Sequence, residues 1–212
     1  MNEKFFDLKK EKQDRMINAA LKVFALNGYR HASTDDIVRE AAISKGLLFH
    51  YFENKLGVYA FVYDYSVRYL LLELSTAVDA KETDLFTLMQ QVETGKMHAM
   101  CGYPYLQPFL NRAQAENVNE ALVAVEERKQ QMEEAYENIY ARADLGKYAA
   151  AEDVVKLRKM MELTIKGLMN ERILEDAFQP EMLYEAILEY LQLSRRLAER
   201  SGQPSDEEIT EK

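Results

Sequence analysis

The sequence predicts an all-α protein of about nine helices. Apolar residues recur at steps of three and four along most of the 212 residues, the period of helices that bury one side. Glycine and proline are scarce, at 8 and 4 residues, whereas a sheet protein with many turns would need more of both. With 48% hydrophobic and 30% charged residues, the chain has the balance of a globular protein.

The composition also excludes several classes of protein. The single cysteine, Cys101, rules out an intrachain disulfide, so we expect a protein of a reducing compartment, the cytoplasm. The first ten residues alternate charged and apolar side chains, unlike a signal peptide. No charge-free apolar run approaches the ~18 residues that a membrane-spanning helix needs, so no membrane partner is expected.

Charge is divided unevenly along the chain. The net charge is −9, yet residues 1–57 hold ten Lys and Arg against eight Asp and Glu. The remaining residues hold 17 basic and 28 acidic side chains. A mildly basic head before an acidic body suits a protein that touches a polyanion with one end only.

Helix-capping residues divide the N-terminal third into four helices. Gly28 follows the first apolar stripe, where a left-handed cap favours glycine. Ser33, Ser44 and Asn54 each precede a new apolar stripe, as N-caps do. The helices are predicted over 7–27, 35–42, 44–52 and 54–78. Because only a tight turn separates the second from the third, the first three form a helix-turn-helix unit.

Longer amphipathic segments follow in the rest of the chain. Gly167 stands in the middle of one of them, where it costs about 1 kcal/mol relative to alanine and indicates close approach of another helix. These helices are predicted over 83–101, 104–114, 118–143, 152–175 and 181–200. The polar tail 201–212 is predicted to be disordered.

The short helix over 44–52 has two contrasting faces. Its inner face, Leu48 and Phe52, would anchor it on the first two helices. The outer face combines cations, a glycine and rings, which suits the major groove of DNA. It consists of Lys45, Gly46, Phe49 and His50, flanked by Leu47 and Tyr51. The alternative is that the rings of Phe49 and Tyr51 complete a core while Lys45 and His50 face solvent, and spacing alone does not choose.

Residues 15–56 resemble the DNA-binding domain of the TetR family of transcriptional regulators. The matching features are an Ala-Ala-Leu-x-x-Phe first helix, Gly28-Tyr29, Ser33-Thr34, the run from Ala42 to Gly46, the aromatic run Phe49-His50-Tyr51-Phe52, and Asn54-Lys55. The resemblance implies that Thr34 and Tyr51 bind DNA phosphates, that Lys55 clamps another, and that the outer face of the 44–52 helix reads the groove. Leu47 and Phe49 stand where the family often has Thr and Tyr, so two hydroxyls are missing and readout shifts toward apolar contacts and shape.

The resemblance also implies a body for dimerisation and ligand binding. It divides the chain into a DNA-binding domain (1–55), a ligand-binding and dimerisation domain (56–200) and the tail (201–212). The apolar residues assigned to a four-helix dimer interface are Leu157, Met161, Ile165, Leu168, Leu183, Ile187, Tyr190 and Leu191. The residues assigned to an adaptable, aromatic ligand pocket are Tyr63, Met97, Met100, Cys101, Tyr103, Phe109, Tyr136, Tyr140 and Met161. For every residue of both sets, packing inside one chain is the alternative.

The expected function is a homodimeric repressor that binds a palindromic operator in double-stranded DNA. A small, largely apolar or aromatic effector would release it by tilting the 54–78 helix. The alternative is an all-helical protein-interaction adaptor that does not bind DNA. No catalytic motif is present, and neither a cofactor nor a metal is expected: His98 and Cys101 lie three apart on a helix, but we interpret the cysteine as an ordinary buried thiol.

Overall fold

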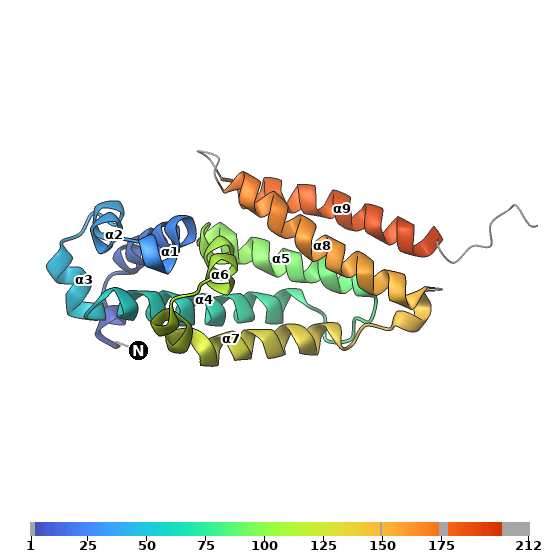
Figure 1. Ribbon diagram of the computed structural model, residues 1–212, viewed down its shortest axis with the longest axis horizontal. Helices are drawn as coiled ribbons and strands as arrows, with labels where there is room; N and C mark the ends of the chain where they lie inside the picture. The colour runs from blue at the N-terminus through green and yellow to red at the C-terminus, as the bar shows by residue number, and fades with distance from the viewer. Residues whose placement is uncertain (1–2, 149, 174–177, 201–212) are drawn as a thin grey trace, which may run out of the picture.

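The computed structural model describes residues 3–148, 150–173 and 178–200. Every regular element within these ranges is helical, which confirms the all-α prediction. The molecule is elongated (Figure 1). The N-terminal helices form a head at one end, and the long helices of the body run along the long axis behind it.

The head contains a 3-10 turn and three α-helices. The predicted start at residue 7 is three residues early, because the chain breaks its helical path between the 3-10 turn and α1. Gly28 has the positive φ expected of a glycine after the apolar stripe, 66°, but its ψ of 174° lies outside the left-handed helical region, so it forms a kink and helical turns continue beyond it to His31. The elements are η1 (Glu3–Asp7), α1 (Lys10–His31), α2 (Thr34–Glu40) and α3 (Lys45–Phe52).

The body is built around α4, which packs against α5 on one side and α7 on the other. Helix α6 packs on α1 of the head, and α8 and α9 pack on each other and close the far side of α5 and α6. The elements are α4 (Lys55–Ala77), α5 (Leu85–Gly102), α6 (Leu106–Gln114), α7 (Asn119–Tyr140), η2 (Leu145–Lys147), α8 (Ala151–Arg172) and α9 (Pro180–Arg200). The predicted tail 201–212 lies outside the described residues.

Two apolar cores hold these elements together. The first runs from the head through α4 into α6 and α7, and the second joins α5, α8 and α9. Since α4 belongs to the first core along most of its length, the head and the front of the body are packed as one unit.

The junction between α3 and α4 depends on a glycine. Asn54 caps α4, as predicted, by accepting a hydrogen bond from the Gly57 amide at 2.9 Å. A Cβ atom on Gly57 would lie 2.0 Å from the carbonyl oxygen of Phe52, so no other residue fits there without moving the backbone. The close approach fixes the direction in which α3 leaves the body.

None of the helices in the described part of the chain is both long enough and apolar enough to span a membrane.

Candidate nucleic-acid interface

Helix α3 presents the predicted faces. Leu48 and Phe52 are buried, at 1% and 6% exposed, whereas Lys45, Gly46 and His50 are exposed. Leu47, Phe49 and Tyr51 are half-buried. Tyr51 sits edge-on to the buried ring of Phe5 at 5.7 Å, so it contributes to the core while remaining accessible. Neither Phe49 nor His50 is sealed inside the molecule.

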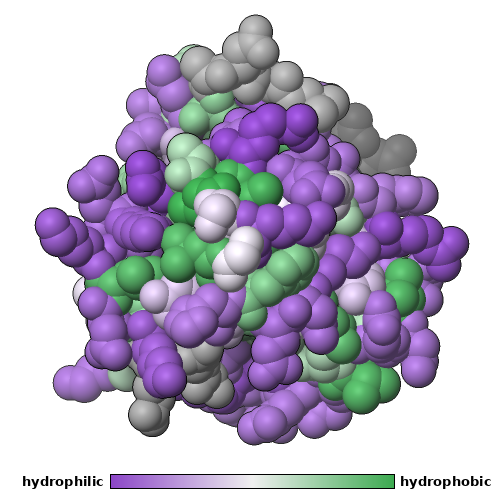
Figure 2. All heavy atoms as spheres, turned by 90° about the vertical axis from the view of Figure 1, so that its left-hand side faces the viewer, coloured by the Kyte–Doolittle hydropathy of each residue, from purple (hydrophilic) through white to green (hydrophobic). Residues whose placement is uncertain are grey.

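The end of the molecule that carries α3 has a mixed surface. Figure 2 shows this end face-on, with a central band of apolar residues bordered by hydrophilic side chains. Half-buried Leu47 and Phe49 belong to the apolar residues of this end, and Lys45 and His50 to the polar ones. Such a surface can meet thymine methyl groups and base acceptors together.

The tight turn before α3 is built by the backbone. Ala42 adopts a left-handed conformation, with φ of 51°, and the amide of Ile43 donates to the Val38 carbonyl at 3.0 Å. The Ser44 hydroxyl then accepts from the Leu47 amide at 3.2 Å, which confirms it as the N-cap of α3. The angle between α2 and α3 is therefore set by local hydrogen bonds.

The cations near this surface are paired with neighbouring carboxylates. Lys45 lies 2.8 Å from Asp35 on α2, with both side chains at least half exposed. Lys22 on α1 lies 2.6 Å from Glu40. Exposed pairs of this kind contribute about 0–1 kcal/mol, so Lys45 can exchange its partner for a phosphate or a base at little cost.

Lys55 is engaged within the protein. Its ammonium group donates to the carbonyl oxygens of Tyr29, Ala32 and Arg30 at 2.9, 3.3 and 3.4 Å. It also lies 4.5 Å from the centre of the Tyr29 ring. The residue for which the resemblance implies a phosphate clamp thus ties the start of α4 to the end of α1.

Tyr29 extends this tie into the body, a link that sequence reasoning missed. Its amide donates to Glu116 Oε2 at 2.9 Å, and its hydroxyl to Glu120 Oε1 at 2.5 Å. Burial and the two carboxylates raise the pKa of the Tyr29 hydroxyl. Burial works against ionisation of Glu116, but the backbone amides of Asn117, Tyr29 and Val118 outweigh it and lower the pKa of that carboxyl group. Glu116 and Glu120 are 87 and 91 residues from Tyr29 in the sequence, so no local sequence pattern predicts these hydrogen bonds.

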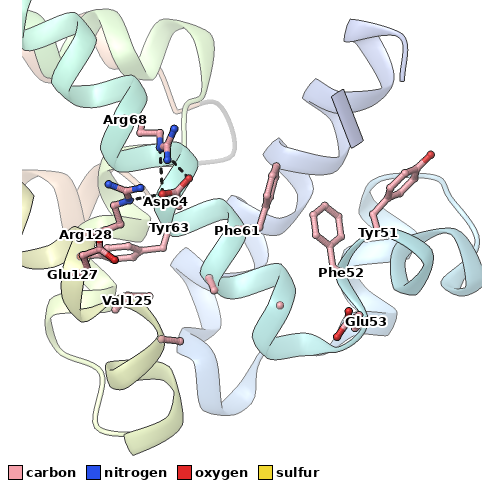
Figure 3. Close-up of a pocket in the computed structure, with 13 residues that line it drawn as sticks. Tyr51, Phe52, Glu53, Phe61, Tyr63, Asp64, Arg68, Val125, Glu127 and Arg128 are labelled. Atoms are coloured by element: carbon pink, nitrogen blue, oxygen red, sulfur yellow. Dashed lines mark hydrogen bonds and ion pairs between the residues drawn. The ribbon is translucent and has the colours of Figure 1, made fainter. Parts of the chain in front are cut away.

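A groove of about 660 Å³ separates the end of α3 and the start of α4 from α7. Its floor includes the buried rings of Phe52 and Phe61, and Tyr51 lies at its edge (Figure 3). At the other end Asp64 of α4 pairs with Arg128 of α7 and with Arg68, whose Nε lies 3.1 Å away. The Asp64–Arg128 pair fixes α7 against α4 beside the head.

The predicted pocket residues fall in different places. Only Tyr136 and Tyr140 line a cavity of about 230 Å³ inside the body, between α5, α6, α7 and α8. Tyr63 lines the groove of Figure 3. The others line neither space: Met100, Tyr103, Phe109 and Met161 are buried in the cores, and Met97 is half-buried. The interpretation of Cys101 as a buried thiol was wrong, because it is exposed and lies 3.3 Å from Glu181.

The predicted dimer residues lie mostly inside the chain. Leu157 and Leu168 are half-buried, and Tyr190 is 43% exposed. The remaining five are buried in the second core: Met161, Ile165, Leu183, Ile187 and Leu191. They leave little surface for a partner, because the inner side of α9 faces α5 and α8 rather than solvent.

No group of three or more potential metal ligands occurs among the residues that the structure describes. His98 has Glu73 at 3.9 Å as its acidic neighbour, and Cys101 bonds to Met97 and Glu181.

Together, a capped turn, a buried inner face and an accessible outer face on α3 define a helix-turn-helix fold. Residues 16–60 match the family model described as "Bacterial regulatory proteins, tetR family". These residues form a TetR-family DNA-binding domain of the kind found in transcription regulators, which confirms the resemblance seen in the sequence.

Two curated relatives support this assignment. The "Uncharacterized HTH-type transcriptional regulator YuxN" of Bacillus subtilis is 36% identical over 78 residues, 35% of this chain and 26% of that protein. The "Uncharacterized HTH-type transcriptional regulator TtgW" of Pseudomonas putida is 41% identical over 49 residues, 23% of this chain and 37% of that protein. The chain thus spans about a quarter to a third of the length of these relatives.

Solved structures share the fold over most of the chain. A TetR family transcriptional regulator from Chloroflexus aurantiacus gives a TM-score of 0.55 at 22% identity, covering 94% of this chain and 93% of that one. The fatty acid degradation regulator FadR from Bacillus halodurans gives 0.51 at 18% identity, covering 85% and 96%. At these identities the likeness extends the fold assignment to the helical body.

Proposed function

We propose that this protein is a homodimeric transcriptional repressor that binds a palindromic operator and is released by a small effector. Residues 1–55 read the DNA, and residues 56–200 dimerise and bind the effector. It acts in the cytoplasm and catalyses no reaction. The observation that carries the proposal is the outer face of α3, where exposed Lys45, Gly46 and His50 stand beside half-exposed Leu47 and Phe49.

The remaining DNA contacts come from the edges of the head. Thr34, the first residue of α2, and Tyr51 are both half-buried and can reach phosphates on either side of the groove. Lys55 adds positive potential near the surface, but its hydrogens are directed at carbonyl groups. We therefore assign it a positioning role for α4 in addition to the implied phosphate contact.

The dimer is supported by apolar surface on α8 and α9. Of the eleven large hydrophobic residues exposed in the described part of the chain, seven lie on these two helices. On α9 they follow steps of eight, three and four, which places them along one side of the helix. The seven residues are Val155, Met160, Leu163, Met182, Tyr190, Leu193 and Leu197. A second copy covering this face would place two α3 helices on successive turns of DNA.

The effector response is supported by the contacts of α4 and α6. One side of α6 lines the body cavity through Gln107, Asn111 and Gln114, while the helix also packs on α1. Helix α4 starts beside α3 and is fixed to α7 by Asp64 and Arg128. An effector shifts the spacing of the reading helices to the extent that it binds one spacing more tightly than the other.

Selection of bound sequences from a random pool of duplex DNA, at a stated salt concentration, tests the proposal. We expect a palindrome whose half-sites lie about one helical turn, ~34–36 Å, apart. Affinity should fall steeply with added salt, because phosphate contacts release counterions. Enrichment of no sequence, or of an asymmetric one, would contradict the dimeric operator reader.

Two histidine variants distinguish a loss of DNA contacts from a loss of folding stability. His50→Ala should weaken selected-site binding by about 1–3 kcal/mol without lowering the melting temperature, since His50 is exposed. His31→Ala, an exposed histidine at the end of α1, serves as the control and should bind normally. An adaptor that does not read DNA would show no difference between the two.

A further inference from the structure

The body cavity is small and is lined by four helices, α5, α6, α7 and α8. At about 230 Å³ it is below the ~300–1,000 Å³ typical of sites for drug-sized ligands. Its apolar walls come from Met89, Ile165, Met169 and the ring of Tyr140. One face of that ring is covered by the guanidinium group of Arg158, 4.1 Å from the ring centre.

Four of the five charged side chains that line the cavity form two ion pairs, and the fifth, Lys166, is exposed and donates to Gln114 Oε1 at 3.2 Å. Lys96 and Glu93 of α5 lie 2.7 Å apart, with side chains 16% and 5% exposed. Burial opposes the charged form of Lys96, but Glu93 and the neighbouring tyrosines outweigh it and raise the pKa of the ammonium group, so Lys96 stays charged. Arg158 is paired with Glu162 at 3.2 Å. A ligand entering this space therefore meets no unbalanced buried charge.

Two buried polar atoms of residues that line the cavity have no hydrogen-bond partner in the described structure. They are the hydroxyl oxygen of Tyr136 and the carbonyl oxygen Oε1 of Gln107, a residue only 6% exposed. The amide nitrogen of Gln107 already donates to Asn111 Oδ1 at 2.9 Å, so the carbonyl end is the one left over. A buried polar group without a partner costs about 1–3 kcal/mol, and a folded protein keeps few of them without a reason.

We propose that this cavity binds a small uncharged molecule carrying an N–H or O–H donor next to a carbonyl-type acceptor, on a compact apolar body. The donor bonds to Gln107 Oε1 and the acceptor receives the Tyr136 hydroxyl hydrogen. The apolar part packs on Met89, Ile165 and Met169. This inference rests on the proposed function in treating the cavity as the effector site, and it makes the effector more polar than the sequence suggests.

Four planar probes of nearly equal shape separate the possible ligand classes. Benzamide has the donor and the acceptor, benzoate is an anion, benzamidine is a cation, and toluene is apolar. Titrating each at millimolar concentration into the full chain, with binding followed by protein NMR shifts, should show benzamide binding most tightly. Preference for any of the other three overturns the proposal, and so does the absence of binding by all four.

Single-residue variants place the probe in this cavity. Tyr136→Phe and Gln107→Met should each weaken benzamide binding about fivefold to tenfold, the loss expected for one hydrogen bond. Tyr136→Phe should leave the melting temperature of the free protein unchanged or higher, because it removes an unpartnered hydroxyl. Tyr69→Phe, which lies on α4 outside the cavity, is the matched control and should bind benzamide as the wild type does. Equal binding by all variants overturns the assignment.

The readout does not involve DNA, so it fails independently of the proposed function. If benzamide binds as expected but the chain ignores duplex DNA, the cavity chemistry stands and the regulator hypothesis fails. If the chain selects an operator but the probes show another preference, the regulator stands and the ligand class is wrong.

Discussion

The interior of the head and the interior of the body contain different kinds of side chains. The head is filled with rings that contact one another: Phe5 alone lies within 5.7 Å of Tyr51, Phe52 and Phe61. Its buried polar side chain, Gln13, donates to the carbonyls of Phe6 and Leu8. The body instead buries an ion pair and, among the described residues, leaves two uncharged polar atoms, Gln107 Oε1 and the Tyr136 hydroxyl oxygen, without partners. An apolar interior whose buried polar group is hydrogen-bonded keeps the head in one shape. An interior with unpartnered polar atoms, like that of the body, is suited to binding a ligand.

Of the changes that test this comparison, removing one partner of the buried ion pair should lower the free energy of unfolding the most. Lys96→Met leaves the Glu93 carboxylate uncompensated, so we expect the free energy of unfolding to fall by about 3–5 kcal/mol. Chemical denaturation measures the loss. The double variant Lys96→Met with Glu93→Leu should recover most of it, because two apolar side chains replace the pair. A double variant as unstable as the single one would show that packing, not charge, dominates this site.

The second test compares Gly57, in the first turn of α4, with Gly46 on α3. Gly57→Ala forces a Cβ atom against the Phe52 carbonyl and should destabilise the protein by about 1–3 kcal/mol or more. Gly46→Ala meets nothing within 4 Å and should be neutral or stabilising by about 0.5–1 kcal/mol. Thermal melts compare them. Equal melting temperatures would contradict the tight α3–α4 junction.

The third test concerns pH and the start of α5. Asp84 accepts from the amide and hydroxyl of Thr87, both at 2.8 Å, and from Tyr148 and Arg195 at 3.0 and 2.5 Å. Burial works to raise the pKa of this carboxyl group, but these donors and the Arg195 charge outweigh it and hold it below its usual range. Asp84→Ala should therefore lower the free energy of unfolding by about 1–2 kcal/mol at neutral pH.

The pH dependence of that loss provides its own check. A depressed pKa adds stability above the unfolded-state pKa, and the contribution disappears as the pH falls through the folded-state pKa. The difference between wild type and Asp84→Ala should thus shrink at pH values below the usual range of aspartate. Asp153→Ala, which removes an exposed partner of Lys156, should change stability by less than about 0.5 kcal/mol at any pH.

The smallest expected effect belongs to Gly167 in α8. A Cβ atom there meets nothing within 4 Å, so Gly167→Ala should stabilise the single chain by up to about 1 kcal/mol. If a second copy approaches closely at this point, the same variant should weaken self-association in sedimentation experiments. Unchanged self-association would place Gly167 outside the dimer interface.

The helices and their starts could be predicted because the signals are local. Ser44 and Asn54 cap the helices that follow them, as their side chains predicted. The two faces of α3 followed from helical periodicity, because Leu48 and Phe52 are four residues apart. The break at Gly28 was predicted because glycine adopts positive φ without strain, although the structure has a kink there and not a left-handed cap.

The body could not be predicted at the same level. Which side of α9 faces inward depends on how it docks on α5 and α8. From the sequence alone, Leu183, Ile187 and Leu191 could therefore be assigned equally well to a dimer interface or to the core. In the sequence, Lys96 and Glu93 resemble an ordinary exposed ion pair on one helix. The structure shows that Tyr136 of α7 covers the pair. Gly57 gave no signal, because its role is defined by a carbonyl oxygen of the preceding helix.

Helix α6 is only nine residues long, and both its sides are in use. Gln107 and Asn111 form part of the cavity wall, while the same short rod supports α1 of the head. A molecule bound in this cavity would therefore touch the same short helix that packs on α1 of the head.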